Sequence, residues 1–205
     1  MTALKTIEHL SPEDYLLWEE TQDIRHEYYQ GEVFAMAGTT LRHNAIIQNM
    51  MFGLRKHIKS NKCRLYSENI KVEVCTNSYY TYPDLVAACD PRDENDQASV
   101  IKHPSLIVEV LSKSTAIYDK GLKMRKYFGI KSLKYYILVS QNGYLAEVYE
   151  RVAETDIWQL QYFEQLNDTI TLARLNNLQI LMAQIYEDID ISPNETPEES
   201  DLIAR

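Results

Sequence analysis

The chain has 205 residues, of which 45% are apolar and 25% are charged, and its net charge is −9. These proportions match an ordinary globular protein and exclude a largely disordered or fibrous chain. No stretch holds the roughly 18 consecutive apolar residues of a membrane span, and the first ten residues lack the apolar segment of a signal peptide. We therefore expect a cytoplasmic protein with no membrane partner.

The length is suited to one domain, and the charge is unevenly distributed along it. The segment Glu187–Arg205 contains seven acids and one base, so it carries −6 of the −9. We expect residues 1–191 to form a single domain and residues 192–205 to be a disordered acidic tail. Two stretches, Leu41–Ser67 and Lys120–Lys134, contain six bases each and no acid. Such stretches can neutralise nucleic-acid phosphates, although a solvated helix face is an equal alternative for either one.

The first third of the chain predicts two helices with a hairpin between them. Ser11 followed by Pro12 is typical of a helix start, and this helix should end near Glu20. Two strand-like runs within residues 27–36 flank Gln30-Gly31, which predicts a hairpin. Apolar residues then recur at helical spacing, which predicts a long amphipathic helix that packs on a sheet; they are Leu41, Ala45, Ile46, Met50, Leu54 and Ile58.

The sheet itself is predicted from four apolar runs, of which the last two lack clean alternation and should be covered on both faces. These runs are Cys63–Ser67, Ile70–Cys75, Asp84–Cys89 and Ser105–Leu111.

The second half of the chain predicts a helix, a further central strand and an antiparallel extension. The helix should span Thr115–Phe128 and the strand Tyr135–Val139. The extension should come from Gly143–Tyr149 and Trp158–Phe163, and a short helix should follow at Ile180–Tyr186. Together these elements predict an α/β (α+β) fold, with a central mixed β-sheet flanked by helices.

The cysteines predict neither a disulfide framework nor a zinc site. There are three of them, Cys63, Cys75 and Cys89, and no two are spaced as a CxxC pair. We expect them to be reduced residues of the core or the strands.

Two carboxylates stand out in the two central strands. Glu109 interrupts an apolar run, so it should pair with a cation, bind a metal or lie at the end of its strand. Asp84 follows Pro83, which belongs at a strand start because it cannot donate to the ladder. Two acids on neighbouring strands can converge on a hard cation such as Mg²⁺. An ion pair with a nearby lysine remains the structural alternative for each acid.

These residues also carry a family resemblance. Pro83-Asp84, followed by Glu109-Val110-Leu111, resembles the PD-(D/E)xK signature of restriction-endonuclease-like proteins. The surrounding segments resemble, in order and spacing, a bacterial family of endonuclease-like proteins long catalogued as a domain of unknown function. Those segments are Tyr28–Ala37, Arg42–Asn44, Tyr82–Val86, Glu109–Ser112 and the set Asp119, Lys123 and Tyr127.

The resemblance implies a restriction-endonuclease-like fold and a metal site. It implies that Asp84 and Glu109 hold Mg²⁺ or Mn²⁺ while a lysine stabilises the phosphate. The signature lysine is replaced here by Leu111, so another lysine is needed or activity is lost. The family pattern favours Lys123, which shares a helix face with Asp119 and Tyr127. Lys113 and Lys120 are the secondary candidates, and a solvated or ion-paired lysine is the structural alternative.

Two upstream residues are weaker candidates. Glu27 resembles an additional acid that many relatives bring towards the metal, and an exposed strand carboxylate is the alternative. His43 can contact phosphate or line the site, whereas an isolated histidine is more often a local hydrogen-bonding residue.

The functional prediction is a metal-dependent endonuclease that hydrolyses nucleic-acid phosphodiester bonds, with DNA as the substrate. The analogy with nucleases that cut both strands predicts a homodimer. The alternative is a non-catalytic nucleic-acid-binding or interaction module that keeps the nuclease fold after losing the signature lysine.

Overall fold

The computed structural model describes residues 9–36, 38–58, 63–112, 116–153 and 155–191. No helix in these ranges is long and apolar enough to cross a membrane. The helices and strands, in chain order, are α1 (Pro12–Glu19), β1 (His26–Tyr29), β2 (Glu32–Ala35), α2 (Leu41–Ile58), β3 (Arg64–Ser67), β4 (Lys71–Cys75), β5 (Tyr79–Thr81), β6 (Leu85–Ala88), β7 (Val100–Ile101), β8 (Pro104–Leu111), α3 (Ala116–Tyr118), η3 (Asp119–Lys123), α4 (Met124–Tyr127), β9 (Tyr135–Ser140), β10 (Ala146–Arg151), β11 (Trp158–Phe163), β12 (Thr169–Leu172), β13 (Leu178–Leu181) and α5 (Met182–Ile185), with 3₁₀ turns η2 (Pro91–Asp93) and η4 (Ala173–Leu175).

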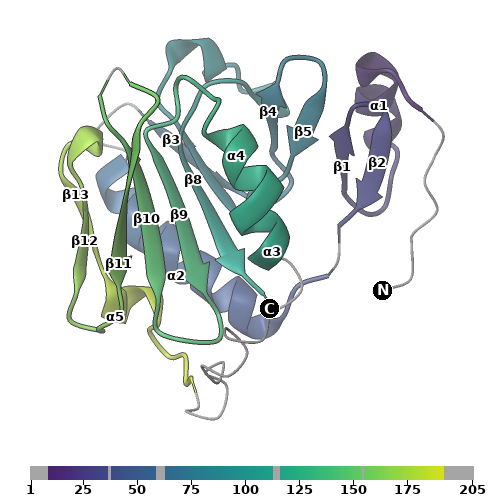
Figure 1. Cartoon of the computed structure of the whole chain (residues 1–205). Helices are drawn as coiled ribbons and strands as arrows, with labels where there is room; N and C mark the ends of the chain where they lie inside the picture. The colour runs from purple at the N-terminus through teal and green to yellow at the C-terminus, as the bar shows by residue number, and fades with distance from the viewer. Residues whose placement is uncertain (1–8, 37, 59–62, 113–115, 154, 192–205) are drawn as a thin grey trace, which may run out of the picture.

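The main sheet has six strands in the order β11-β10-β9-β8-β6-β3 (Figure 1). β8 and β9 are parallel, whereas every other neighbouring pair in this sheet is antiparallel. The sheet is therefore mixed, and β10 with β11 forms the antiparallel extension that the sequence predicts.

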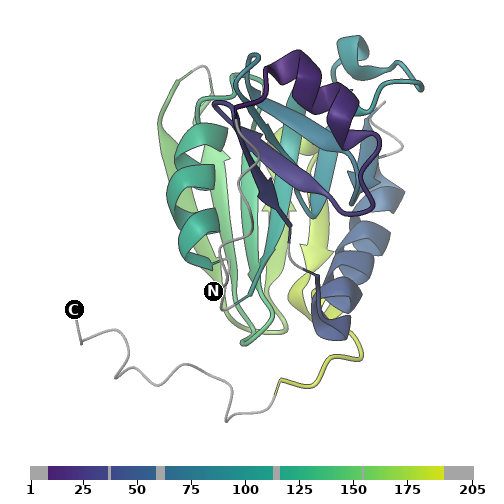
Figure 2. The same ribbon diagram turned by 90° about the vertical axis from the view of Figure 1, so that its right-hand side faces the viewer.

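Helices cover both faces of this sheet, as Figure 2 shows, with α2 on one side and α3 and α4 on the other. Because side chains alternate across a strand, β8 directs Leu106, Val108 and Val110 towards the core that includes α2. Ile107 and Leu111 belong to the core on the α4 side. The intervening position on that face is Glu109, so the strand's period of two places this carboxylate under α4.

A second sheet of five strands, in the order β2-β1-β5-β4-β7, lies beside the first. The prediction of one sheet is thus wrong for the run that forms β4, which pairs with β5 and β7 instead. A run of apolar residues predicts a strand but not the strand with which it pairs. The short β5 is a strand that the sequence does not predict. The predicted β1–β2 hairpin is present, with Gln30 and Gly31 at φ angles of 51° and 96° in its turn.

The helix predicted over 115–128 is interrupted by one π-helical turn. Residues Asp119–Lys123 form this turn, between α3 and α4. Single π-turns of this kind often occur at functional sites, because they redirect the side chains they carry. The side chains of Asp119 and Lys123 are both buried.

The prediction of reduced cysteines is wrong for two of the three residues. Cys63 and Cys89 form a disulfide, while Cys75 is free. The antiparallel register of β3 and β6 pairs Arg64 with Ala88, which brings the two cysteines opposite each other just beyond those residues. Pairing across strands leaves no local spacing motif, and so this bond is not predictable from the spacing of the cysteines.

Candidate active site

Asp84 and Glu109 are neighbours because of the register between β6 and β8. Leu85 lies opposite Val108, and the same register continues to Asp84 and Glu109. The backbone N–H of Asp84 donates to Oε2 of Glu109 at 3.4 Å. Pro83 directly precedes Asp84, and β6 starts at Leu85, as expected for a proline at a strand start.

The Asp84 carboxylate lies at the more exposed end of the cluster. Its Oδ2 accepts a hydrogen bond from the backbone N–H of Val110 at 2.6 Å. Its Oδ1 lies 3.1 Å from Nε2 of His43, which comes from the first turn of α2. The side chains of Asp84 and His43 are 19% and 14% exposed. Solvent and ligands therefore reach Asp84 more readily than Glu109.

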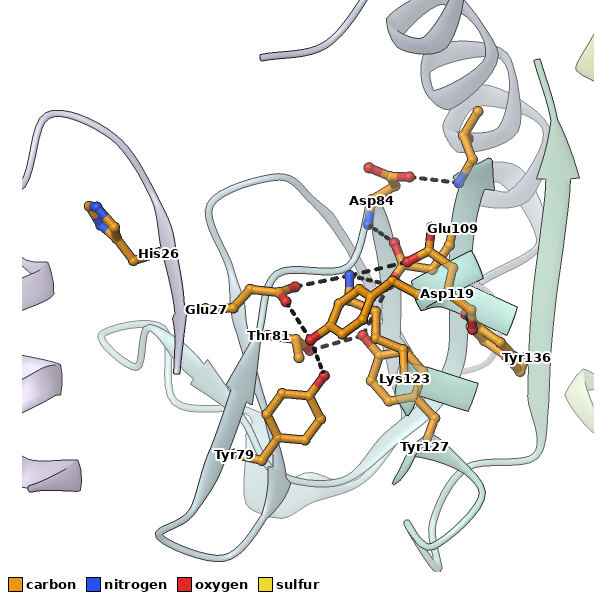
Figure 3. Close-up of polar contacts among 12 residues, drawn as sticks. His26, Glu27, Tyr79, Thr81, Asp84, Glu109, Asp119, Lys123, Tyr127 and Tyr136 are labelled. Carbon is orange, nitrogen blue, oxygen red and sulfur yellow. Dashed lines mark hydrogen bonds and ion pairs between the residues drawn. The ribbon is translucent and has the colours of Figure 1, made fainter. Parts of the chain in front are cut away.

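The Glu109 carboxylate is buried under the helical layer (Figure 3). Its Oε1 accepts hydrogen bonds from Nζ of Lys123 at 3.2 Å and from the hydroxyl of Tyr127 at 3.0 Å. Burial raises the pKa of Glu109 well above its usual value; Lys123 opposes this shift, and the nearby Asp119, Asp84 and Glu27 add to it.

Lys123 is the centre of the buried charges. Its Nζ lies 2.9 Å from Oε1 of Glu27, 3.2 Å from Oε1 of Glu109 and 3.6 Å from Oδ1 of Asp119. Burial alone would lower the pKa of Lys123, but these carboxylates outweigh that effect and raise it well above its usual value. The π-turn thus supplies an ammonium to Glu109. The signature position for a lysine, two residues after Glu109, is occupied by the buried Leu111.

Glu27 reaches this cluster from β1 of the second sheet. Its Oε2 accepts a hydrogen bond from the hydroxyl of Tyr118 at 3.1 Å, and that hydroxyl lies 2.9 Å from the hydroxyl of Tyr79. Its buried Oε1 is within ion-pair distance of Lys123 but makes no hydrogen bond of regular geometry to the residues that the structure describes. Glu27 is thus held by one hydroxyl and by its attraction to the ammonium.

The structure brings together most of the residues singled out from the sequence. Asp84, Glu109, Lys123, Glu27 and His43 form one connected cluster. Their catalytic roles stay predictions, since contacts do not establish chemistry.

The other two candidate lysines are not part of this cluster as described. Lys120 pairs with Glu147 on β10, whereas Lys123 on the same π-turn contacts Glu109. Lys113 lies outside the described residues. Tyr118 is a further member of the site that the sequence does not predict, because its contact with Glu27 spans 91 positions. No local pattern signals such a contact.

The donor set is compatible with a hard divalent cation. Asp84 and Glu109 offer carboxylate oxygens, which Mg²⁺ and Mn²⁺ prefer. Within the described ranges no three His, Cys, Asp or Glu side chains are grouped as a ready metal cage. Mg²⁺ is commonly bound by one or two carboxylates, with water and substrate phosphate completing its shell, so two acids fit such an ion.

Replacing Glu109 with Gln should change how stability depends on pH. An acid whose pKa is raised on folding binds its proton more tightly in the folded state, so stability rises as the pH falls through that pKa. Without the acid, the variant should gain stability relative to the wild type as the pH rises above the ordinary pKa of a carboxyl group. Chemical denaturation of the metal-free proteins at a series of pH values measures this.

The control for this experiment is Glu32→Gln, which removes an exposed carboxylate from β2. It should leave the pH dependence unchanged. Parallel pH curves for the wild type and Glu109→Gln would contradict the raised pKa.

Comparison with known proteins places this site in context. A family model described as "Uma2: Putative restriction endonuclease" matches residues 12–183. Two proteins of Synechocystis sp., both described as uncharacterized, are 36% identical over 163 residues and 31% identical over 155 residues. These matches cover 80% and 75% of this chain, and 84% and 88% of the two relatives.

One solved structure shares the fold. It is the crystal structure of "a putative nuclease belonging to DUF820" from Anabaena variabilis, which matches with a TM-score of 0.67 at 16% sequence identity. The match covers 88% of this chain and 99% of that chain. The mixed sheet with its flanking helices is thus a nuclease-like fold.

Proposed function

This chain belongs to the Uma2 family, described as "Putative restriction endonuclease", and from that premise we propose that it is a Mg²⁺- or Mn²⁺-dependent endonuclease acting on DNA. The family resemblance inferred from the sequence is confirmed by the family match. The proposal adds the metal, the substrate and the roles of individual residues.

The observation that carries the proposal is the arrangement around Glu109. Asp84 and Glu109 lie side by side on adjacent strands, and an ammonium contacts the second of them. This combination of two acids and a lysine is the one that the signature implies. Lys123 on the π-turn provides the charge that Leu111 cannot.

The roles follow from the chemistry of each side chain. Asp84 and Glu109 would hold the metal, which when bound lowers the pKa of a coordinated water and so supplies hydroxide. Lys123 stabilises the negative charge that develops on the phosphate, since it lies in a water-poor site where a fixed cation has a large effect. His43 orients Asp84 through its contact with Oδ1. Asp84, as the more exposed acid, faces the approaching substrate.

The basic stretches give only limited support for DNA binding. Arg64 pairs with Asp96, and Lys131 with Asp156, so part of this charge is neutralised within the protein. Arg55 and Arg125 are exposed and available for phosphate contacts. The preference for DNA rests mainly on the family's description as restriction endonucleases. A homodimer would place two sites on the two strands of a duplex.

A second function is favoured by one specific observation. Lys123 is buried among three carboxylates, so its charge is already compensated within the protein. If substrate and metal do not release it, the chain is a nucleic-acid-binding module without catalysis. Salt-sensitive DNA binding is expected from both functions, but only the nuclease turns over substrate.

Metal-dependent cleavage tests the proposal directly. Purified protein incubated with supercoiled plasmid DNA and Mn²⁺ or Mg²⁺ should produce nicked or linear products, and chelation of the metal should stop the reaction. Size-exclusion chromatography with light scattering measures the proposed dimer. DNA binding without cleavage, for all divalent metals and for both double- and single-stranded DNA, would favour the binding module.

A further inference from the structure

A second buried carboxylate lies outside the Asp84–Glu109 cluster, at the end of α1. Glu19 is fully buried. Its Oε1 accepts hydrogen bonds from the backbone N–H of His26 at 2.9 Å and from the hydroxyl of Tyr82 at 2.8 Å. Its Oε2 lies 3.0 Å from Nδ1 of His26. A carboxylate is unfavourable at the C-terminal end of a helix and costly to bury, so these contacts are needed to hold it there.

The two partners of Glu19 adjoin two different parts of the candidate active site. His26 directly precedes Glu27 on β1, and Figure 3 shows their side chains on opposite sides of the strand, with Glu27 directed at Lys123. Tyr82 precedes Asp84 by two residues. One carboxylate therefore ties the strand that carries Glu27 to the segment that carries Asp84.

The backbone of β1 is held to the core by a short pairing with β5. The paired positions are Tyr28 with Tyr80 and Tyr29 with Tyr79, and the backbone N–H of Gln30 donates to the carbonyl of Ser78 at 2.8 Å. From α1, the hydroxyl of Tyr15 donates to the carbonyl of His26 at 2.6 Å. Tyr82 is itself fixed from the other side, because Nζ of the buried Lys71 donates to its hydroxyl at 3.3 Å. Glu19 therefore joins the hairpin to a tyrosine that Lys71 also holds.

We propose that Glu19 is a positioning residue for the active site, which holds Glu27 against Lys123 by joining β1 to Tyr82. The catalytic part of this inference rests on the proposed nuclease function, while the geometric part does not. Side chains that orient a site through its neighbours typically change activity by about tenfold to a hundredfold when removed.

The geometric part is tested by the resonance of the Lys123 side chain. The protein is labelled with ¹⁵N and ¹³C lysine. The Glu27→Gln variant provides the reference, because it gives the Nζ and Cε chemical shifts of Lys123 when the carboxylate of Glu27 is absent. Glu19→Gln should move these shifts towards those of Glu27→Gln, because the hairpin no longer holds Glu27 in place. Tyr82→Phe removes only one of the contacts of Glu19, so it should move the Lys123 shifts in the same direction but by a smaller amount. This variant replaces Glu19→Gln in the test if Glu19→Gln does not fold.

The matched control is Tyr28→Phe, which removes a hydrogen bond from the same strand without touching Glu19 or Tyr82. The hydroxyl of Tyr28 donates to the carbonyl of Leu10 at 3.0 Å. This variant should leave the Lys123 shifts at their wild-type values. If Glu19→Gln, or Tyr82→Phe in its place, lowers the melting temperature but leaves the Lys123 shifts unchanged, Glu19 has a purely structural role and the inference is overturned.

Cleavage kinetics test the catalytic part. Glu19→Gln should lower kcat by about tenfold to a hundredfold with little change in KM. In a Glu27→Gln background the same change should cause no further loss, since both substitutions remove one contribution. Fully multiplicative losses would overturn the positioning role. A wild-type protein that cleaves nothing would contradict the proposed function alone, because the Lys123 shifts would still decide the geometric part.

Discussion

Replacing Lys123 with Met should lower DNA cleavage by at least about a hundredfold, because the variant keeps a similar apolar stem but loses the charge that stabilises the phosphate. The same change should destabilise the metal-free protein by about 3–5 kcal/mol, the usual cost of removing one partner from a buried ion pair. Glu27, Glu109 and Asp119 would be left buried without their shared cation. Denaturant unfolding measures the stability, and cleavage rates are measured at a temperature where the variant is folded.

The pH dependence and a control variant make this prediction specific. The stability deficit of Lys123→Met should shrink from about pH 8 to about pH 5, because the uncompensated carboxylates can then take up protons. Lys120→Met is the matched control on the same turn. Its ammonium is 43% exposed and pairs with Glu147, which also keeps a hydrogen bond from the hydroxyl of Tyr149, so the loss should be smaller than for Lys123→Met. Equal effects at Lys120 and Lys123, or a fully active Lys123→Met, would refute the role of Lys123.

Replacing Asp84 with Asn should lower metal-dependent cleavage by about a thousandfold or more, with a much smaller effect on folding. The amide keeps the shape of the side chain but not the charge that attracts a divalent cation. Both oxygens of Asp84 have a partner. Oδ2 accepts a hydrogen bond from the backbone N–H of Val110, and Oδ1 lies within hydrogen-bond distance of Nε2 of His43. Asn keeps one acceptor, so about 1 kcal/mol of stability should be lost. Cleavage rates measure the loss of activity, calorimetric titration with Mn²⁺ measures the loss of metal binding, and thermal unfolding measures the change in stability.

Asp96→Asn provides the matched control for this substitution. Asp96 is 77% exposed and pairs with the half-buried Arg64, and it is not a member of the carboxylate cluster. The control should bind Mn²⁺ and cleave DNA like the wild type. If Asp84→Asn retained its metal affinity but melted far lower, Asp84 would be a structural residue paired with His43 and the proposed site would be incorrect.

Local sequence patterns are sufficient to predict the main elements and the pair of acids. Helical spacing of apolar residues from Leu41 to Ile58 corresponds to α2, and the non-alternating runs before and after Glu109 correspond to the fully buried β8. These features are local, because burial on one stripe or on two faces leaves a periodicity that can be read along the chain. Pro83-Asp84 and Glu109 were also recognisable, since a charge is rare within a buried strand.

Which of these residues come into contact depends on tertiary packing. The sequence offers three candidate lysines in place of the signature lysine. In the structure, Lys123 on the π-turn contacts Glu109, whereas Lys120 contacts Glu147. Likewise, the pairing of β1 with β5 and not with the main sheet brings Glu27 to the cluster. Such contacts depend on strand partners and helix register, which are set by packing between segments distant in the chain. Contacts of this kind leave no local sequence pattern. The same is true of the Cys63–Cys89 disulfide and of the hydrogen bond between Tyr82 and Glu19.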